Sequence, residues 1–421
     1  MEVTLDNDST ILVRRRPAPN GGFIASQTDI TESKRAEREL ARSRALLDGV
    51  VENSDALIYA KDLEGRYILV NRRWENLTKV PRVEALNHDD FTFFTAESAE
   101  EFRANDAKVI AGGKTLTTEE NVATADGAKI YLSSKFPLSG EDGEVMGICG
   151  ISTDIHERKL AEQALADAYE VISDSIRYAS RIQRALLPPE HFLTESLADH
   201  FIIWEPRDEV GGDMYWYRQC ENGFLILLAD CTGHGVPGAF MTMIASGALD
   251  RAMREHPDGD PAAVLHVMNR SIKRSLNQDT KDGESDDGMD IGVCRVEPEA
   301  GRLVYAGAKF SLFRVNGEDV EEIKGDKASV GYRKVPLEQS YANHEIAVAE
   351  GDCFFLSTDG LTDQVGGPKR RMFGKKRVKD LLLELAGRPM PEQRDRLYQS
   401  FVDYQGEQIR RDDLSVFGFR L

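Results

Sequence analysis

The sequence lacks both a membrane-spanning run and any cysteine pattern with a structural use. No stretch approaches the roughly 20 apolar residues that a membrane helix needs. The N-terminal segment Met1–Leu5 lacks the basic region and apolar core of a signal peptide. The five cysteines are scattered and form no CxxC pair, which argues against a disulfide scaffold and a thiolate zinc site. We therefore expect a cytoplasmic protein that does not engage a membrane.

Positive charge is also in deficit. Lys and Arg number 53 against 72 Asp and Glu, and the formal net charge is -19. A surface this acidic repels nucleic acid and attracts divalent cations. The 421 residues, 41% of them hydrophobic, are enough for two or three domains with full-sized cores. We expect no nucleic-acid partner.

An internal repeat marks the first part of the chain. The segments Thr28–Leu40 and Thr153–Leu165 agree at eight positions, namely Thr, Asp, Ile, Glu, Lys, Ala, Glu and Leu. A repeat of this length indicates tandem modules. Only two short predicted strands, Ile11–Arg16 and Gly22–Ala25, precede the first copy, and a Pro/Asn/Gly turn joins them. Residues 1–30 are therefore predicted to be the tail of a truncated upstream module.

Residues 31–157 are predicted to form a linker helix and one complete module. With the segments Lys61–Arg66, Val70–Asn71, Phe136–Leu138 and Thr153–Ile155, this module resembles a PAS sensor domain. The resemblance implies an antiparallel sheet with helices, and a domain that senses a ligand or dimerises; a small molecule is the expected ligand. The predicted order is a helix (Ser43–Asn53), two strands (Ala56–Ala60, Tyr67–Asn71), short helices, and three strands (Glu119–Ala123, Lys129–Pro137, Val145–Ser152).

Residues 158–190 are predicted to form a signalling helix. Apolar and small residues recur at alternating spacings of four and three, which over about four heptads favours a parallel coiled coil between two copies of the chain. A helix packed on its own domain is the alternative. Pro188 and Pro189 end the helix. The seam residues are Ala161, Leu165, Ala168, Ile172, Ser175, Ala179, Ile182 and Leu186.

Acidic residues in the remaining segment, 191–421, stand at strand edges. An apolar run, Phe224–Ala229, ends in Asp230 and is followed by a glycine-rich turn. Asp359 follows a second apolar run, while Asp213 and the pair Asp412-Asp413 stand just before predicted strands. Buried carboxylates are costly unless they are paired, so a cluster of them usually coordinates cations. Carboxylates without Cys or a His cluster favour Mg²⁺ or Mn²⁺, and two such ions can activate a water for phosphate ester hydrolysis.

Four motifs in order resemble the SpoIIE-type serine phosphatases, bacterial relatives of the type 2C metal-dependent phosphatases. They are Gly211-Gly212-Asp213, Ala229–Gly235, Ser357–Asp363 and Arg411–Val416. The helix end Ile176–Pro188 is typical of the entrance to that domain. The resemblance covers about Ser175 to Leu421. It implies an αββα sandwich with two Mn²⁺ or Mg²⁺ ions between its sheets.

The resemblance also implies roles for individual residues. Asp230 would bridge both metals, and Asp213 with the backbone carbonyl of Cys231 would complete one of them. Asp359 and Asp412 would hold the other. Asp413 would support the site or bind metal weakly.

Two positions depart from the family's pattern. Asp290 can point to either face of its strand and so could reach a metal. Trp216 replaces an acid that many relatives carry.

The activity implied is hydrolysis of phosphoserine or phosphothreonine on a partner protein, a STAS-type anti-sigma-factor antagonist by analogy. A basic loop, Lys369–Arg377, follows Asp359, and its Arg370, Arg371 and Lys375 are candidates for holding the substrate. A solvated flap is the alternative for this loop.

Other classes of function fit the motifs less well. One is a catalytically inactive PAS-containing scaffold, which the loss of a single metal ligand would produce; no ligand is missing from the motifs. A diguanylate cyclase is suggested by Gly211-Gly212-Asp213, but the following Met214-Tyr215 does not fit. A sensor histidine kinase also joins PAS to a coil, but no glycine-rich ATP-binding series follows.

The seam yields a first prediction. Ile172→Pro should break the helix between sensor and catalyst, because proline removes a backbone donor and clashes with the preceding turn. Phosphatase activity should then no longer follow the state of the sensor. Activity assays and light scattering on the full chain test this. Unchanged dimerisation and regulation would contradict it.

Overall fold

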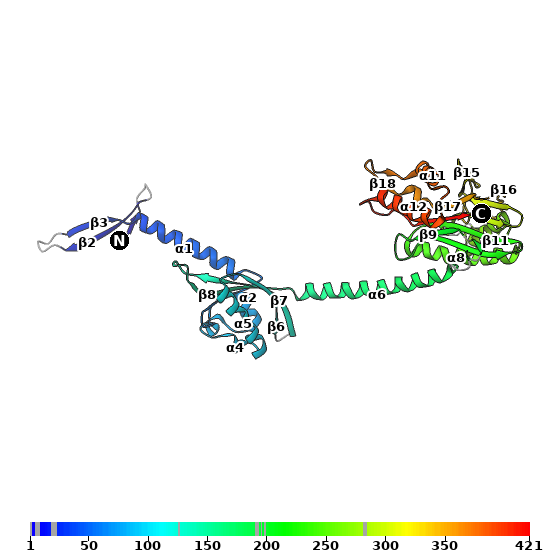
Figure 1. Ribbon diagram of the computed structural model, residues 1–421. Coiled ribbons are helices and arrows are strands. Elements are labelled where there is room, and N and C mark those ends of the chain that lie inside the picture. The colour runs from blue at the N-terminus through cyan, green and yellow to red at the C-terminus, as the bar shows by residue number, and fades with distance from the viewer. Residues whose placement is uncertain are drawn as a thin grey trace. The chain divides into compact units, whose positions relative to one another are not determined.

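The computed structural model describes residues 2–4, 9–17, 23–124, 127–189, 193–194, 196–197, 199–280 and 284–421. The chain divides into two compact units, Met1–Ala168 and Tyr169–Leu421. Helix α6 (His156–Leu186) runs from the first unit into the second (Figure 1). Within the described residues, no helix is both long and apolar enough to span a membrane.

The first unit opens with a small antiparallel sheet of strand order β1-β2-β3. The two predicted strands are confirmed as β2 (Thr10–Pro17) and β3 (Phe23–Asp29), and β1 (Glu2–Thr4) adds a third. The turn predicted between β2 and β3 lies at residues 18–22, outside the described residues. Helix α1 (Thr31–Glu52) is one helix, so the predicted start at Ser43 is wrong. No proline, and no glycine before Gly49, interrupts its helix-favouring residues.

The remainder of the first unit has the layout expected of a PAS domain. Its five-stranded antiparallel sheet has the order β5-β4-β8-β7-β6, and the predicted series of two strands, short helices and three strands is confirmed. Aromatic residues from strands and helices, including Tyr67, Trp74 and Phe102, fill its core. The elements are β4 (Leu57–Asp62), β5 (Tyr67–Val70), α2 (Arg72–Thr78), α3 (Arg82–Ala85), α4 (Asp90–Phe93), α5 (Ala96–Gly112), β6 (Leu116–Thr124), β7 (Gly127–Ser139) and β8 (Val145–Asp154).

The second unit contains two five-stranded antiparallel sheets, ordered β10-β11-β12-β13-β16 and β15-β14-β17-β20-β9. Strand β11 (Gly223–Cys231) shows how they pack, because its side chains alternate between two cores. Phe224, Ile226 and Leu228 face the other sheet, where they join residues such as Phe354 and Phe417 of β17 and β20. Asp230 is the next residue on that face.

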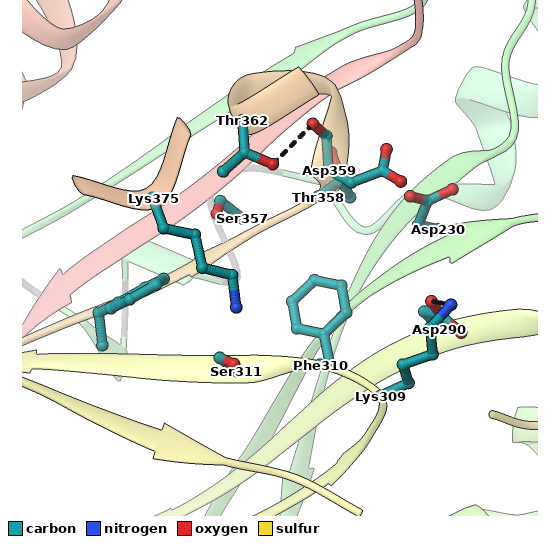
Figure 2. Close-up of a pocket in the computed structure, with 11 residues that line it drawn as sticks. Asp230, Asp290, Lys309, Phe310, Ser311, Ser357, Thr358, Asp359, Thr362 and Lys375 are labelled. Atoms are coloured by element: carbon teal, nitrogen blue, oxygen red, sulfur yellow. Dashed lines mark hydrogen bonds and ion pairs between the residues drawn. The ribbon is translucent and has the colours of Figure 1, made fainter. Parts of the chain in front are cut away.

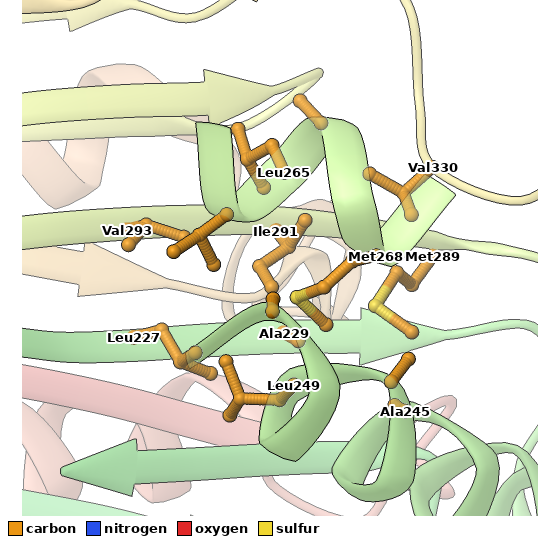
Figure 3. Packing of buried hydrophobic residues seen from close by; sticks show 14 of the residues in the cluster. Leu227, Ala229, Ala245, Leu249, Leu265, Met268, Met289, Ile291, Val293 and Val330 are labelled. Carbon is orange, nitrogen blue, oxygen red and sulfur yellow. The ribbon is translucent and has the colours of Figure 1, made fainter. Parts of the chain in front are cut away.

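Helices cover the outer face of each sheet. Alternate β11 residues, such as Leu227 and Ala229, pack with Leu249 of helix α8 and Met268 of helix α9 (Figure 3). Helices α11 and α12 cover the second sheet through a separate core that includes Leu382. The layers are therefore helix, sheet, sheet, helix, which confirms the predicted αββα sandwich.

The elements of the second unit follow the end of α6. Helix α10 and the short strands β18 and β19 lie beyond the strand β17 and lead to α11. The bounds are β9 (His200–Glu205), β10 (Asp213–Cys220), β11 (Gly223–Cys231), α8 (Gly235–Glu255), α9 (Pro261–Ser275), β12 (Met289–Glu297), β13 (Arg302–Ala308), β14 (Ser311–Val315), β15 (Val320–Lys324), β16 (His344–Ala347), β17 (Cys353–Ser357), α10 (Asp359–Asp363), β18 (Val365–Gly366), β19 (Arg371–Met372), α11 (Gly374–Leu385), α12 (Met390–Gln405) and β20 (Leu414–Arg420).

Helix α6 carries exposed apolar residues along the predicted seam. Leu165 is 72% exposed and Ile172 58%, whereas Ile182 and Leu186 are each 38% exposed. In the single chain these seam positions are therefore largely uncovered. A second chain packed along α6 would cover them, so the coiled coil stays a prediction.

The packing of α8 yields a stability prediction. Leu249→Ala should lower the free energy of unfolding of the second unit by roughly 2–5 kcal/mol, because it empties a fully buried position in the core beneath the first sheet. Met243→Ala on the same helix is the control; that side chain is 47% exposed, so the cost should be small. Chemical denaturation followed by tryptophan fluorescence measures both. Equal losses would contradict the assigned packing.

Candidate metal centre

Three aspartates stand side by side across neighbouring strands of the first sheet. The register pairs Asp213 of β10 with Asp230 of β11, and Asp230 with Asp290 of β12. Residues directly opposite each other in an antiparallel pair point to the same face, and like charges placed this way repel. The row faces the second sheet, since Asp230 continues the inter-sheet series of β11. The sequence alone did not determine which face of the sheet Asp290 points to. The strand register places Asp290 on the same face as Asp230.

The second sheet brings its acids to the same space. Asp359 begins α10 directly after β17, and in Figure 2 its carboxylate points toward that of Asp230. Asp412 precedes β20, and its charge raises the pKa of the Asp230 carboxyl. Asp230, Asp290 and Asp359 line one cavity of about 90 Å³. The predicted convergence of the acid-bearing strand edges is therefore present in the fold.

Thr358 joins the two sheets inside the site. Its hydroxyl donates to Asp213 Oδ2 at 2.8 Å and accepts from the backbone N–H of Ser415 at 3.1 Å. Thr358 is 1% exposed and Asp213 3%. This bond fixes the direction of the Asp213 carboxylate from the opposite sheet.

Asp413 anchors the backbone that leads into β10. One carboxylate oxygen accepts the N–H of Arg207 at 2.6 Å, and the other accepts that of Gly212 at 2.5 Å. A Cβ at Gly211 would lie 2.7 Å from both Asp413 oxygens, so glycine permits this approach. These contacts suit the supporting role predicted for Asp413.

His234 lies in the turn after β11, and its side chain contacts the loop before β10 and not the row of acids. Its Nδ1 lies 3.0 Å from Asp208 Oδ2, and its Nε2 lies 2.8 Å from Arg207 Nη1. The ring therefore joins the turn after β11 to the loop before β10.

The electrostatics of the site favour a bound cation. Burial, followed by repulsion from Asp213 and Asp359, raises the pKa of the Asp230 carboxyl to about 10. Burial also raises the pKa of Asp213 well above its ordinary value, and burial and neighbouring acids raise the pKa of Asp359. A group whose pKa is raised this way resists ionisation until positive charge arrives. Divalent cations would supply that charge.

The donor atoms fit a hard cation. They are all oxygens, and Asp290 Oδ1 is a buried oxygen for which the described residues provide no hydrogen-bond partner. The Cys231 carbonyl oxygen, which was predicted to bind metal, lies close to Gly212, the residue before Asp213. A Cβ on Gly212 would lie 2.9 Å from this oxygen. Among the described residues, no group of three His, Cys, Asp or Glu side chains lies in an arrangement that could hold a metal ion by itself, so a bound ion would need further ligands such as the Cys231 carbonyl and water. Mg²⁺ commonly binds through one or two carboxylates and keeps several waters, which suits this open arrangement.

Two lysines stand at the rim of the cavity. Lys309 Nζ lies 3.0 Å from Asp290 Oδ2, and Lys375 Nζ lies 2.9 Å from Glu322 Oε1. Both side chains line the cavity (Figure 2). Lys375 was a sequence candidate, whereas Lys309 was missed. Its place depends on the register of the β12–β13 hairpin, in which Ile291 pairs with Ala308 and the next position brings Lys309 beside Asp290, and no local sequence pattern gives that register.

The other two candidates of the basic loop do not line this cavity. Its described lining includes neither Arg370 nor Arg371, and Arg371 is exposed in β19. A role for them in holding the phosphate stays a prediction that the fold does not support.

The end of α6 contacts the loop before β10, a connection that the sequence did not reveal. Gln183 Nε2 donates to the carbonyl of Gly211 at 2.6 Å and to Thr242 Oγ1 at 3.0 Å. Its Oε1 accepts the N–H of Gly211 at 3.2 Å. Gln183 is 4% exposed, so α6 is bonded to the backbone two residues from Asp213.

Comparison with known proteins identifies both units. Residues 221–421 match the family model of stage II sporulation protein E (SpoIIE), and residues 51–160 match that of the PAS fold. The solved SiaA-PP2C domain of Pseudomonas aeruginosa is 42% identical, with a TM-score of 0.56; the alignment covers 61% of this chain and 99% of that domain.

Two curated relatives match a smaller share. The methanogenesis regulatory histidine kinase FilI of Methanothrix harundinacea is 32% identical over 44% of this chain and 21% of its own length. The uncharacterized protein y4lL of Sinorhizobium fredii is 26% identical over 38% of this chain and 19% of its own. The chain thus spans about a fifth of the length of these relatives.

The contact between the sheets yields a prediction. Thr358→Val keeps the shape but leaves Asp213 Oδ2 and the Ser415 N–H without this partner, so the free energy of unfolding should fall by roughly 1–3 kcal/mol. Thr362→Val in α10 is the control, because its hydroxyl bonds only within its own turn and its side chain is less buried. Chemical denaturation measures both. Equal stabilities of the two variants would contradict the role of Thr358.

Proposed function

Because the chain belongs to the SpoIIE-type, PP2C-like serine phosphatase family and carries a PAS domain, we propose that it is a signal-regulated protein phosphatase. It hydrolyses phosphoserine or phosphothreonine on a partner protein with a water activated by two divalent metals, Mn²⁺ or Mg²⁺. The row of Asp213, Asp230 and Asp290 facing Asp359 is the observation that carries this proposal.

The proposed ligand roles are those that the motif resemblance implies. Asp230, at the centre of the row, would be shared by both ions. Asp213, whose carboxylate is oriented by Thr358, would hold one of them with the Cys231 carbonyl. Asp359 and Asp412, from the second sheet, would hold the other. When bound, such ions lower the pKa of a water and offset charge on phosphoryl oxygens. Asp413 holds the loop that carries Asp213 in place.

The substrate's phosphate would enter between the acids and the two lysines. A phosphomonoester carries up to two negative charges, so it needs cations on the side away from the acids. Lys309 and Lys375 line the cavity that Asp230 and Asp359 also line, and each can donate charge-assisted hydrogen bonds to phosphoryl oxygens. We assign both to phosphate binding.

The proposed partner is a phosphorylated STAS-type protein, and the family resemblance supports this. The rest of the basic loop, including Arg370 and Arg371, would then contact the partner's surface outside the cavity. The proposed setting is the cytoplasm, without nucleic acid or membrane as a partner.

Regulation is proposed to pass through α6. A homodimer formed along residues 158–187 would cover the exposed seam, and a ligand of the PAS domain would shift the helix. Within the first unit, Lys159 of α6 pairs with Glu119 of β6 at 2.6 Å. Within the second, Gln183 of α6 bonds to the loop before Asp213. One helix thus contacts both the sensor sheet and the loop beside the proposed centre.

A metal-dependent assay tests the proposed chemistry. The wild-type chain should hydrolyse p-nitrophenyl phosphate with Mn²⁺ and stop on chelation. Asp230→Asn should lower kcat/KM by more than about 100-fold, because it removes the charge shared by both ions. The control Asp395→Asn changes an exposed acid of α12 and should keep full activity.

Absence of Mn²⁺-dependent hydrolysis in the wild type would instead favour the inactive signalling scaffold. Full activity in Asp230→Asn would overturn the proposed centre.

A further inference from the structure

A chain of buried ion pairs runs through the PAS domain. Lys61 Nζ lies 2.6 Å from Asp90 and 2.9 Å from Asp106, and Lys135 Nζ lies 3.0 Å from Asp106 and 2.8 Å from Glu120. None of the five side chains is more than 6% exposed. They come from strands β4, β6 and β7 and helices α4 and α5, so the network connects the sheet to the helices that cover it.

The charges of this network do not balance. Three carboxylates face two ammonium groups, which leaves one negative charge in excess within the network. The further donors are neutral: the Tyr67 hydroxyl bonds to Asp90 at 2.6 Å and the Asn105 amide to Glu120 at 3.0 Å. Neutral donors stabilise a carboxylate but do not cancel its charge. An uncompensated buried charge is expensive, so the site favours one more cation.

A cavity adjoins the network on the side of its two outer carboxylates. Its volume open to a water-sized sphere is about 30 Å³, and Asp90 and Glu120 form part of its wall. That volume accommodates a group of only a few heavy atoms. The described hydrogen bonds and ion pairs of Glu120 fall on Oε1, so Oε2 is the oxygen offered to a new donor. Aromatic rings make up much of the remaining wall: Tyr59, Tyr67, Trp74, Phe94 and Phe102.

Aromatic faces in this domain already bind ammonium groups. Lys61 Nζ lies 5.2 Å from the Tyr59 ring centroid and 5.0 Å from that of Tyr67, and Lys135 Nζ lies 5.2 Å from that of Phe102. Cation–π attraction strengthens when the cation is desolvated. Trp74, the ring type that attracts cations best, is 2% exposed and lines the same cavity.

We propose that this cavity binds a small protonated amine of a few heavy atoms, held by Glu120 and Asp90 and enclosed by the aromatic wall. An anion would add to the excess negative charge, and a neutral molecule would leave it unchanged. The wall's rings suit the carbon end of an organic amine. The two serine hydroxyls that also line the cavity, Ser133 and Ser152, are hydrogen-bonded to each other at 2.7 Å, so the two carboxylates would be the main oxygen ligands of an inorganic ion, fewer than such ions prefer. The inference deepens the sensor half of the proposed function and is independent of the phosphatase chemistry.

Calorimetric titration and thermal unfolding of the full chain with methylammonium chloride test the proposal. Saturable binding and a raised melting temperature of the PAS transition are expected. The comparisons are methanol, a neutral molecule of the same size, and NaCl and KCl at equal ionic strength. They should give neither saturable binding nor a raised melting temperature. An equal response to methanol, Na⁺ or K⁺ would overturn the assignment to an amine, as would no binding of methylammonium.

Variants separate charge from packing. Glu120→Gln removes the excess charge with little change of shape and should weaken methylammonium binding by about tenfold or more. Glu119→Gln, the next residue of β6 with a 48% exposed side chain, should bind as the wild type does. Val122→Leu keeps every charge but fills part of the cavity, and should also weaken binding. Wild-type affinity in both Glu120→Gln and Val122→Leu would overturn the site.

Hydrolysis of p-nitrophenyl phosphate on the same samples keeps the two proposals apart. An active chain that binds no amine refutes the amine site alone. An inactive chain that binds methylammonium through Glu120 refutes the phosphatase alone.

Discussion

Repulsion among buried carboxylates is the constraint on which the second unit depends. Antiparallel pairing fixes Asp213, Asp230 and Asp290 in one row. The second sheet, which packs on the first through an apolar layer, carries Asp359 and Asp412. The Asp230 carboxyl at the centre resists ionisation, because burial and repulsion from Asp213 and Asp359 raise its pKa to about 10. The fold thus keeps the acids buried near one another at a cost that its cores and the bonds of Thr358 and Asp413 offset, and bound divalent cations would lower that cost.

The two units differ in what compensates their buried negative charge. In the PAS domain the counterions are internal, since Lys61 and Lys135 alternate with three carboxylates and leave a single charge in excess. In the sandwich Lys309 pairs with Asp290 and Lys375 lines the same cavity, so most of the compensation for the acids would come from bound ions. The proposed regulatory route between them is α6, whose Gln183 bonds to the loop before Asp213.

The sequence was most informative where a pattern is local. An apolar run ending in an acid predicted the places of Asp230 and Asp359, and the predicted succession of strands and helices in the PAS domain is the observed one. Two features depend on the register between strands and could not be predicted from local patterns. They are the face to which Asp290 points and the position of Lys309 beside it. The buried network was hidden for the same reason, since Lys61 and Asp106 are 45 residues apart. The basic loop looked uniform, yet the fold turns only its Lys375 into the cavity.

The proposed metal centre is tested most directly by a crystal structure of the chain grown with Mn²⁺, with anomalous scattering measured at the manganese edge. Two anomalous peaks are expected between the sheets, one shared by Asp230 with Asp213 and one shared by Asp230 with Asp359 and Asp412. Crystals of Asp230→Asn should lose at least one of them. Well-diffracting crystals of the wild type without a peak beside Asp230 would contradict it.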